Sequence, residues 1–361
     1  MLISNCRDIK IVWLSVNIIM VFSMVAIGGI TRLTDSGLSM TDWALFGGVI
    51  PPLNDSDWRH YFSLYKQTPE FLIKNFDMNI SEFKMIFFWE YFHRIWGRLI
   101  GLTFLLPLGY LWYKGAFTFY EKRFLAILSI LGLFQAFMGW FMVKSGLVDK
   151  PDVSHFRLSI HLLTAFLIYS MLVFLLWRIK TEPLHKNTQS QLTGNDKLNS
   201  WIVYSIISVL ITVATGAFVS GTDSGLAYNS FPLMDNNLLP PILLENSNKN
   251  LLMLLNDSGF IQFFHRLFAT LTLITILITF ILNRKSEITV FSKKALNVLF
   301  FFVVFQYTLG ITILLTYVPM LLGLVHQLSS LMILTILVLV LSEINVVKSR
   351  IAYINNPASN Q

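Results

Sequence analysis

Long apolar stretches dominate the pattern of hydrophobic and polar positions along the chain. A membrane helix needs about 20 mostly apolar residues to cross the hydrocarbon core, and eight stretches are long enough. The first is too long for the apolar region of a cleavable signal peptide. The pattern predicts an all-α integral membrane protein with eight transmembrane helices. These are expected at residues 11–30, 85–113, 124–143, 158–177, 201–219, 260–282, 295–317 and 319–341.

The composition and the distribution of charge agree with this pattern. Of the 361 residues, 55% are hydrophobic and 13% are charged, whereas soluble domains carry about 25% charged residues. The net charge of +7 would suggest nucleic acid in a soluble protein, but here the basic residues lie in short loops between apolar stretches. Loops rich in Lys and Arg stay in the cytoplasm. We therefore expect no nucleic-acid partner, and a protein of the bacterial inner membrane with both termini in the cytoplasm.

The two long loops that are poor in such clusters, residues 31–84 and 220–259, are then expected on the periplasmic side. The first is rich in Asp, Glu and Trp. It is expected to form a partly folded cap.

The two halves of the chain repeat each other. The pentapeptide Thr-Asp-Ser-Gly-Leu at residues 34–38 recurs at 222–226, and the pair His-Arg at 93–94 recurs at 265–266. Each half contains four predicted spans, an even number, so the halves have the same orientation and form parallel repeats. Phe134, Gln135 and Gly139 of the first half match Phe305, Gln306 and Gly310 of the second.

This repeat predicts two four-helix bundles. The first half covers residues 1–180 and the second covers 200–345. A cytoplasmic linker at 181–199 joins them, and a cytoplasmic tail occupies 346–361.

Four of the seven histidines lie inside predicted spans, at a similar depth near the periplasmic side. They are His93 and His161 in the first half, and His265 and His326 in the second. An ionisable residue within a span is costly and points to function. For a single histidine, a hydrogen bond to a neighbouring helix is an equally good explanation, but four at one depth favour a cofactor. The single cysteine, Cys6, excludes a Cys-based metal cage.

Two imidazoles on facing helices of a four-helix bundle suit the axial positions of a haem iron. A non-haem metal usually needs a further ligand, commonly a carboxylate, in each half, and only the first half offers one nearby. Arg94 and Arg266 follow His93 and His265 directly, and the planar guanidinium suits haem propionates. Arginines that reach toward the membrane interface are the alternative. Three histidines lie outside the spans, at positions 60, 155 and 185. Of these, His60 and His155 are left with structural roles.

The halves differ at one position that matters for chemistry. Glu90 precedes His93 by three residues and shares its helix face, whereas the second half has Gln262. A carboxyl group beside a bound ligand could act as an acid, a base or a charge stabiliser. An ion pair with Arg94, four residues later, is the structural alternative. The difference predicts a permanent electron-transfer haem in the second half and chemistry in the first.

Taken together, these motifs resemble the haem A synthase family of alphaproteobacteria and mitochondria. The resemblance covers residues 10–345. The segments that carry it are 28–40, 90–94, 155–161, 222–226, 265–266 and 324–327.

The resemblance implies an oxidoreductase that converts the C8 methyl group of haem O to a formyl group by successive hydroxylation. The product is haem A for cytochrome c oxidase. It also implies that Glu90 is catalytic, that His93 and His161 surround the iron of the substrate haem, and that His265 and His326 ligate one haem b. Some bacterial relatives carry a cysteine pair in the first outer loop. This chain lacks that pair, so no thiol-based step is expected.

Haem O, haem O synthase, an electron donor and the lipid bilayer are the expected partners. The sequence leaves open the identity of the donor and whether the protein forms a homo-oligomer. The main alternative function is a di-haem membrane cytochrome b that relays electrons from quinol. A transporter built from repeats is a third class, but its site would lie near the membrane midplane.

Overall fold

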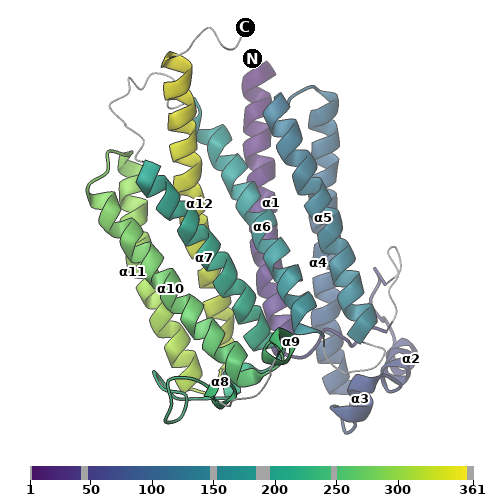
Figure 1. The fold of residues 1–361 in the computed structure, drawn as a ribbon. Helices are drawn as coiled ribbons and strands as arrows, with labels where there is room; N and C mark the ends of the chain where they lie inside the picture. Colours follow the sequence, from purple (N-terminus) through teal and green to yellow (C-terminus); the bar gives the residue numbers. More distant parts are fainter. Residues whose placement is uncertain (1, 42–47, 147–152, 184–195, 245–249, 356–361) are drawn as a thin grey trace. The chain divides into compact units, whose positions relative to one another are not determined.

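The structure is a computed structural model that describes residues 2–41, 48–146, 153–183, 196–244 and 250–355 (Figure 1). Within these ranges it is helical and contains no strand. Eight of the described helices are long and apolar enough to cross a membrane, so the predicted all-α membrane fold is confirmed. They are α1 (Leu2–Leu33), α4 (Ile80–Tyr113), α5 (Phe119–Gly146), α6 (His155–Thr181), α7 (Asp196–Gly221), α10 (Ser258–Arg284), α11 (Val290–Leu315) and α12 (Met320–Asn355).

Short helices occupy the two long loops between spans. In the loop at residues 31–84 they are α2 (Asp55–Tyr65) and α3 (Pro69–Ile73), which agrees with the expected partly folded cap. The second loop contains η1 (Ser224–Leu226), α8 (Pro241–Leu244) and α9 (Leu251–Leu254).

Two predicted segments fall partly outside the described residues. Of the linker at 181–199, residues 184–195 are not described, and His185 is among them. Of the tail at 346–361, residues 356–361 are not described. The described part of that tail continues helix α12 as far as Asn355.

The chain divides into two compact units. The N-terminal unit is Ile19–Ala165, and the C-terminal unit combines Met1–Ile18 with Phe166–Gln361. The boundaries fall inside helices α1 and α6. The arrangement of the two halves as parallel repeats stays a prediction.

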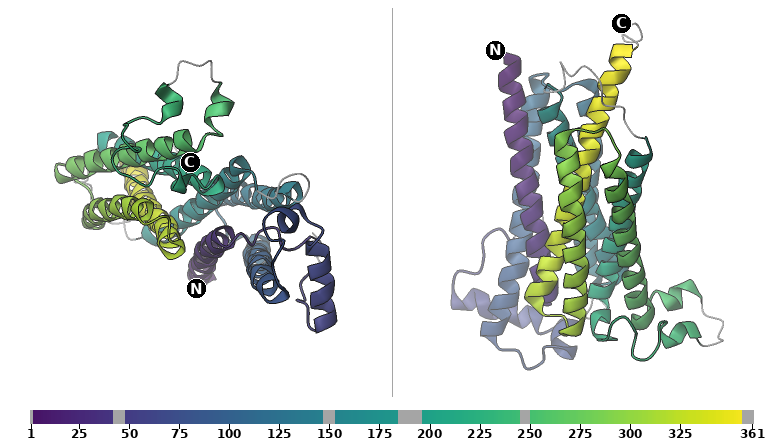
Figure 2. Two further views of the ribbon diagram at one scale, coloured as in Figure 1. Left: turned by 90° about the horizontal axis from the view of Figure 1, so that it is seen from below. Right: turned by 90° about the vertical axis from the view of Figure 1, so that its left-hand side faces the viewer.

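Four helices of the C-terminal unit form a closed ring, because α7 packs on α10, α10 on α11, α11 on α12, and α12 on α7. Helices α10 and α12 therefore occupy opposite corners, and α7 and α11 occupy the other two. Hydroxyl pairs join α7 to α10 inside the apolar interface, at 3.1 Å between Ser205 and Thr279 and 2.7 Å between Ser208 and Thr272. The start of α1 and the end of α12 lie at one end of this unit, and α8 and α9 lie at the other (Figure 1 and Figure 2).

The N-terminal unit carries its cap at the end where α4 begins. Helix α4 starts with a capping box between Asn79 and Glu82, which binds backbone donors that the helix leaves unpaired. Side chains of α2, α3 and α4 contribute to a small buried core cluster. Its buried members are Met40, Tyr65, Phe71, Phe83 and Phe87. The cap is thus held to α4 by burial of aromatic rings.

Candidate functional site

The four span histidines lie as one pair in each unit. In the C-terminal unit, His265 stands on α10 and His326 on α12, the opposite corners of the ring. In the N-terminal unit, His93 stands on α4 and His161 on α6. Each unit therefore brings together the two histidines that the sequence pairs.

A glycine on a neighbouring helix faces each imidazole of the C-terminal unit. A Cβ atom at Gly216 of α7 would lie 3.1 Å from Cε1 of His265. At Gly310 of α11 it would lie 3.0 Å from Cε1 of His326. Because these distances are tighter than ordinary contact, a side chain at either position would displace the ring. Histidines thus occupy one diagonal of the ring of helices, and glycines occupy the other.

The N-terminal unit has the same layer of two histidines and two glycines, with slightly longer distances between glycine and ring. A Cβ atom at Gly28 of α1 would lie 3.3 Å from Nε2 of His93, and one at Gly139 of α5 would lie 3.4 Å from Cε1 of His161. In both units, a glycine lets each of the paired imidazoles pack directly against a neighbouring helix.

The donor set of this layer fits haem. The two imidazoles could supply the axial ligands, and the glycines let each ring pack directly against a neighbouring helix. A bare metal ion fits less well, because the described residues contain no group of three or more His, Cys, Asp or Glu side chains that could hold one.

A threonine orients His265 in the C-terminal unit. The Thr215 hydroxyl donates to the carbonyl oxygen of Thr212 at 3.0 Å and lies 3.1 Å from Nδ1 of His265. It therefore accepts a hydrogen bond from Nδ1–H, which leaves the lone pair of Nε2 for a metal. By the repeat, the residue that corresponds to Thr215 in the first half is Ile27, which cannot make this bond.

Glu90 is buried in a network that fastens the outer loop to α4. Its Oε2 accepts from the Ser39 hydroxyl at 2.7 Å and from the Met40 backbone N–H at 2.8 Å. Its Oε1 accepts from Nη2 of Arg94 at 2.5 Å, and the same nitrogen donates to the Met40 carbonyl at 3.0 Å. The ion pair weighed as an alternative is therefore present. Three donors thus hold this carboxylate in a fixed position.

The second half has the same layout without the negative charge. Nε2 of Gln262 donates to the Tyr228 carbonyl at 3.1 Å, and Nη2 of Arg266 donates to that carbonyl at 2.9 Å and to Oε1 of Gln262 at 3.2 Å. Each arginine that follows a histidine thus also binds its outer loop. Nε of Arg266 is buried without a hydrogen-bond partner among the described residues. It is a donor that an anionic group such as a propionate could use.

The repeated pentapeptide ends helices α1 and α7. Asp35 and Asp223 have left-handed φ angles of 47° and 51°, a conformation that Asp tolerates better than most residues. The hydroxyls of Thr34 and Ser36 lie 2.6 Å apart, and the matching pair in the second half lies 2.5 Å apart. These turns direct the loop backbone toward residues 90 and 262.

A second buried carboxyl lies in the cap. Burial raises the pKa of Glu70 to about 8, with the charges of Glu90 and Asp35 acting in the same direction. Burial also raises the pKa of Tyr65, and the charge of Glu70 adds to this effect. The Tyr65 hydroxyl accepts a hydrogen bond from Asn75 at 2.8 Å. Sequence reasoning singled out neither Glu70 nor Tyr65.

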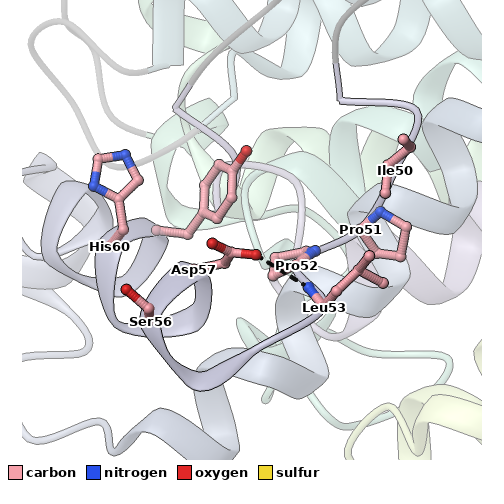
Figure 3. A pocket seen from close by; sticks show the side chains of 8 residues that line it. Ile50, Pro51, Pro52, Leu53, Ser56, Asp57 and His60 are labelled. Carbon is pink, nitrogen blue, oxygen red and sulfur yellow. Dashed lines mark hydrogen bonds between the residues drawn. The ribbon is translucent and has the colours of Figure 1, made fainter.

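The cap also contains an open hollow of about 490 Å³ beside α2 (Figure 3). His60 and Asp57 line it, and Asp57 accepts from the Leu53 backbone N–H at 3.4 Å. His60 therefore lies in a short helix rather than in an irregular loop, while His155 is the first residue of α6. One histidine and one carboxylate are too few to hold a metal ion tightly.

Several residues of the two sites escaped sequence reasoning. Thr215 and Ser39 carry no pattern of their own, because their roles depend on other helices. The glycines did carry a signal, since Gly139 and Gly310 recur at matching positions of the repeat. Their role beside the histidines appears only when the helices are packed.

Residues 11–338 match the model of a protein family described as "Cytochrome oxidase assembly protein". The chain belongs to this family. It is 40% identical over 331 residues to a "Heme A synthase" of Paramagnetospirillum magneticum, with 91% of this chain and 92% of that protein covered. A "Heme A synthase" of Flavobacterium johnsoniae is also 40% identical, over 88% of this chain and 92% of its own length. "Heme A synthase COX15" of Arabidopsis thaliana is 40% identical, over 91% of this chain and 73% of its own length.

Proposed function

We propose that this chain is a haem A synthase, which oxidises the C8 methyl group of haem O to a formyl group by successive hydroxylation. Its membership of the cytochrome oxidase assembly family supports the proposal. The observation that carries the chemistry is the pair of matching networks at Glu90 and Gln262, because only the first contains an ionisable carboxyl. Haem A made by this reaction serves cytochrome c oxidase.

In the C-terminal half, His265 and His326 would be the axial ligands of one haem b. This haem, when bound, accepts and passes on single electrons. Thr215 orients the ring of His265 through Nδ1, as partners of metal-bound histidines commonly do. Arg266 offers its buried Nε to a propionate.

In the N-terminal half, His93 and His161 would hold the iron of the substrate haem O. Glu90 is the catalytic residue of this half. Oxidation of a methyl group moves protons together with electrons, and a carboxylate beside the reacting carbon can take up or return them. The carboxylate of Glu90 is held in place by Arg94, Ser39 and Met40. These contacts restrict the position to which Glu90 can deliver a proton.

We place the protein in the bacterial inner membrane, with its termini in the cytoplasm and its haem sites toward the periplasmic side. The excess of Lys and Arg in the loops on the side of the termini supports this orientation. An electron donor must serve the C-terminal haem, and haem O synthase supplies the substrate.

Haem analysis of the Glu90→Gln variant tests the function. Glutamine keeps the shape and the acceptor oxygen for Ser39 but removes the charge and the proton site. Expressed with haem O synthase in a host that lacks haem A, the wild type should yield haem A on chromatography of extracted haem. The variant should retain haem b and haem O and lose at least about 99% of haem A formation, since a missing general acid or base costs roughly 10²–10⁴ in rate.

The control variant is Glu82→Gln, which changes an exposed carboxyl of the same helix and should form haem A normally. Haem A formation by Glu90→Gln at the wild-type rate would contradict the catalytic role. Wild-type protein that contains haem b alone would instead favour an electron relay.

A further inference from the structure

The matching glutamines of the two halves make different contacts. In the C-terminal unit, Nε2 of Gln306 donates to the backbone carbonyl of His326 at 2.9 Å, and its Oε1 accepts from the Ser329 hydroxyl. Both ends of this amide are thus bound to α12 away from the imidazole. Nδ1 of His326 is buried with no hydrogen-bond partner among the described residues.

In the N-terminal unit, the amide of Gln135 reaches the imidazole itself. Its Nε2 lies 3.3 Å from Nε2 of His161, and its Oε1 is buried with no hydrogen-bond partner among the described residues. The residue that corresponds to Ser329 is Thr164, three residues after His161. The Thr164 hydroxyl donates to the carbonyl of Ile160 in its own helix, at 2.8 Å. Ser329 makes the equivalent bond to the carbonyl of Val325 at 2.8 Å, but its hydroxyl also meets the glutamine amide, which that of Thr164 does not.

This hydrogen bond determines which nitrogen of His161 carries the proton. An amide NH₂ group can only donate, so with this contact Nε2 of His161 accepts with its lone pair and the proton resides on Nδ1, which is buried with no hydrogen-bond partner among the described residues. Nε2 is the ring nitrogen farthest from the backbone, and its lone pair is the one that would bind iron. A hydrogen bond from Gln135 and a bond to iron therefore exclude each other.

We propose that Gln135 makes His161 an exchangeable iron ligand, because its amide competes with the iron of the bound haem for Nε2. The inference rests on the proposed function, in which the N-terminal half must release each haem A that it makes. Gln306, held by Ser329 and the α12 backbone, leaves His326 free to hold its haem permanently. The matching residues Gln135 and Gln306 thus make different contacts in a site that must release its haem and in a site that keeps it.

The spacing of the helices supports the same division. The glycines that face the rings leave a few tenths of an ångström more room in the N-terminal unit, at 3.3–3.4 Å, than in the C-terminal unit, at 3.0–3.1 Å. The ring of His161 is thus packed less tightly against Gly139 than the ring of His326 is against Gly310.

Haem transfer to an acceptor tests this inference without the oxidation reaction. Purified protein is loaded with ferric haem b as the probe, and its transfer to excess apomyoglobin is followed by absorbance. Two phases are expected in the wild type, and a His265→Ala variant identifies the phase of the C-terminal half by removing it. Gln135→Leu should slow the remaining phase by about three- to tenfold, the effect of losing one competing hydrogen bond.

Two controls separate this effect from a general change in packing. Gly132→Ala alters the same helix at a position where a Cβ atom meets nothing within 4 Å, and should leave both phases unchanged. Gln306→Leu should not slow the C-terminal phase, because Gln306 does not contact the ring. Gln135→Met, which keeps an unbranched side chain, should reproduce the slower release and guards against a folding defect specific to leucine.

Unchanged or faster release from the N-terminal half in both Gln135 variants would overturn the inference and leave the proposed function intact. A wild-type protein that takes up haem only in its C-terminal half would overturn the proposed function and the inference together. The ferric low-spin spectrum of the C-terminal haem should be the same in all Gln135 variants and confirms that they are folded.

Discussion

Glu90 and Gln262 stand in two hydrogen-bond networks that differ by one charge. In each, the side chain binds the outer loop and an arginine four residues later binds both the side chain and a loop carbonyl. A buried ion pair is strongly destabilised when one partner is removed, so Glu90 has a structural role besides its proposed chemistry. For this reason, an isosteric Glu90→Gln change is a better test of chemistry than Ala.

Glu70 is the residue whose titration should affect stability most visibly. Its pKa is raised from 4.5 to about 8 by burial, so the folded protein binds its proton more tightly than the unfolded chain does. Its contribution is therefore fully present below about pH 4.5 and is lost as the pH rises toward about 8. Glu70→Gln should remove this pH dependence, so that its melting temperature falls less between pH 5 and 8 than that of the wild type.

Thermal unfolding followed by tryptophan fluorescence at several pH values provides the measurement for Glu70. Asp55→Asn, a change at an exposed carboxyl of the same cap, serves as the control and should retain the wild-type slope. An unchanged slope in Glu70→Gln would show that another group is responsible.

At the scale of the helices, the glycines differ in what they face. Helices α7 and α11 place Gly216 and Gly310 against histidines, whereas Gly101 on α4 faces open space. Glycine lowers helix stability by about 1 kcal/mol relative to alanine in a helix interior. The close contact with the histidine ring, and not helix stability, therefore explains the glycines at positions 216 and 310.

Alanine substitution at these glycines should follow the order of the distances. Gly310→Ala and Gly216→Ala should each cost roughly 1–3 kcal/mol, as overpacking usually does, and shift the low-spin electron paramagnetic resonance signal of the C-terminal haem. Gly28→Ala and Gly139→Ala should have smaller effects, because their neighbours are 3.3 and 3.4 Å away. Gly101→Ala should leave the signal unchanged, and an equal shift in that control would contradict the proposed contact.

For the whole molecule, the important feature is that each pair of histidines lies inside a single compact unit. His93 and His161 belong to the N-terminal unit, and His265 and His326 belong to the C-terminal unit. The two proposed haem sites could therefore differ in ligand exchange and in chemistry, although the sequences of the two halves repeat each other.

Removal of one axial ligand should accordingly empty one site only. His265→Ala should lose haem b from the C-terminal half and still bind haem in the N-terminal half, as measured by haem content and by absorption spectra. His60→Ala changes a histidine of the cap and should bind both haems. A His265→Ala protein with the full haem content and the wild-type bis-histidine spectrum would rule out His265 as a ligand.

The sequence by itself determined the eight spans, the paired histidines and the difference between Glu90 and Gln262. These features depend on local properties: the length of an apolar stretch, the spacing of a repeat, and the cost of an ionisable group in a membrane. The ion pair of Glu90 with Arg94 could also be predicted from the sequence, because residues four apart are neighbours on the surface of a helix.

Only the tertiary structure decided which groups meet from different helices. Gly216 faces His265, Thr215 orients the same ring, and Gln135 reaches Nε2 of His161. The physical reason is that a contact between helices depends on their rotation and depth, to within a few tenths of an ångström. Apolar patterning in a membrane helix does not encode that rotation, because the lipid-facing and buried sides are both apolar.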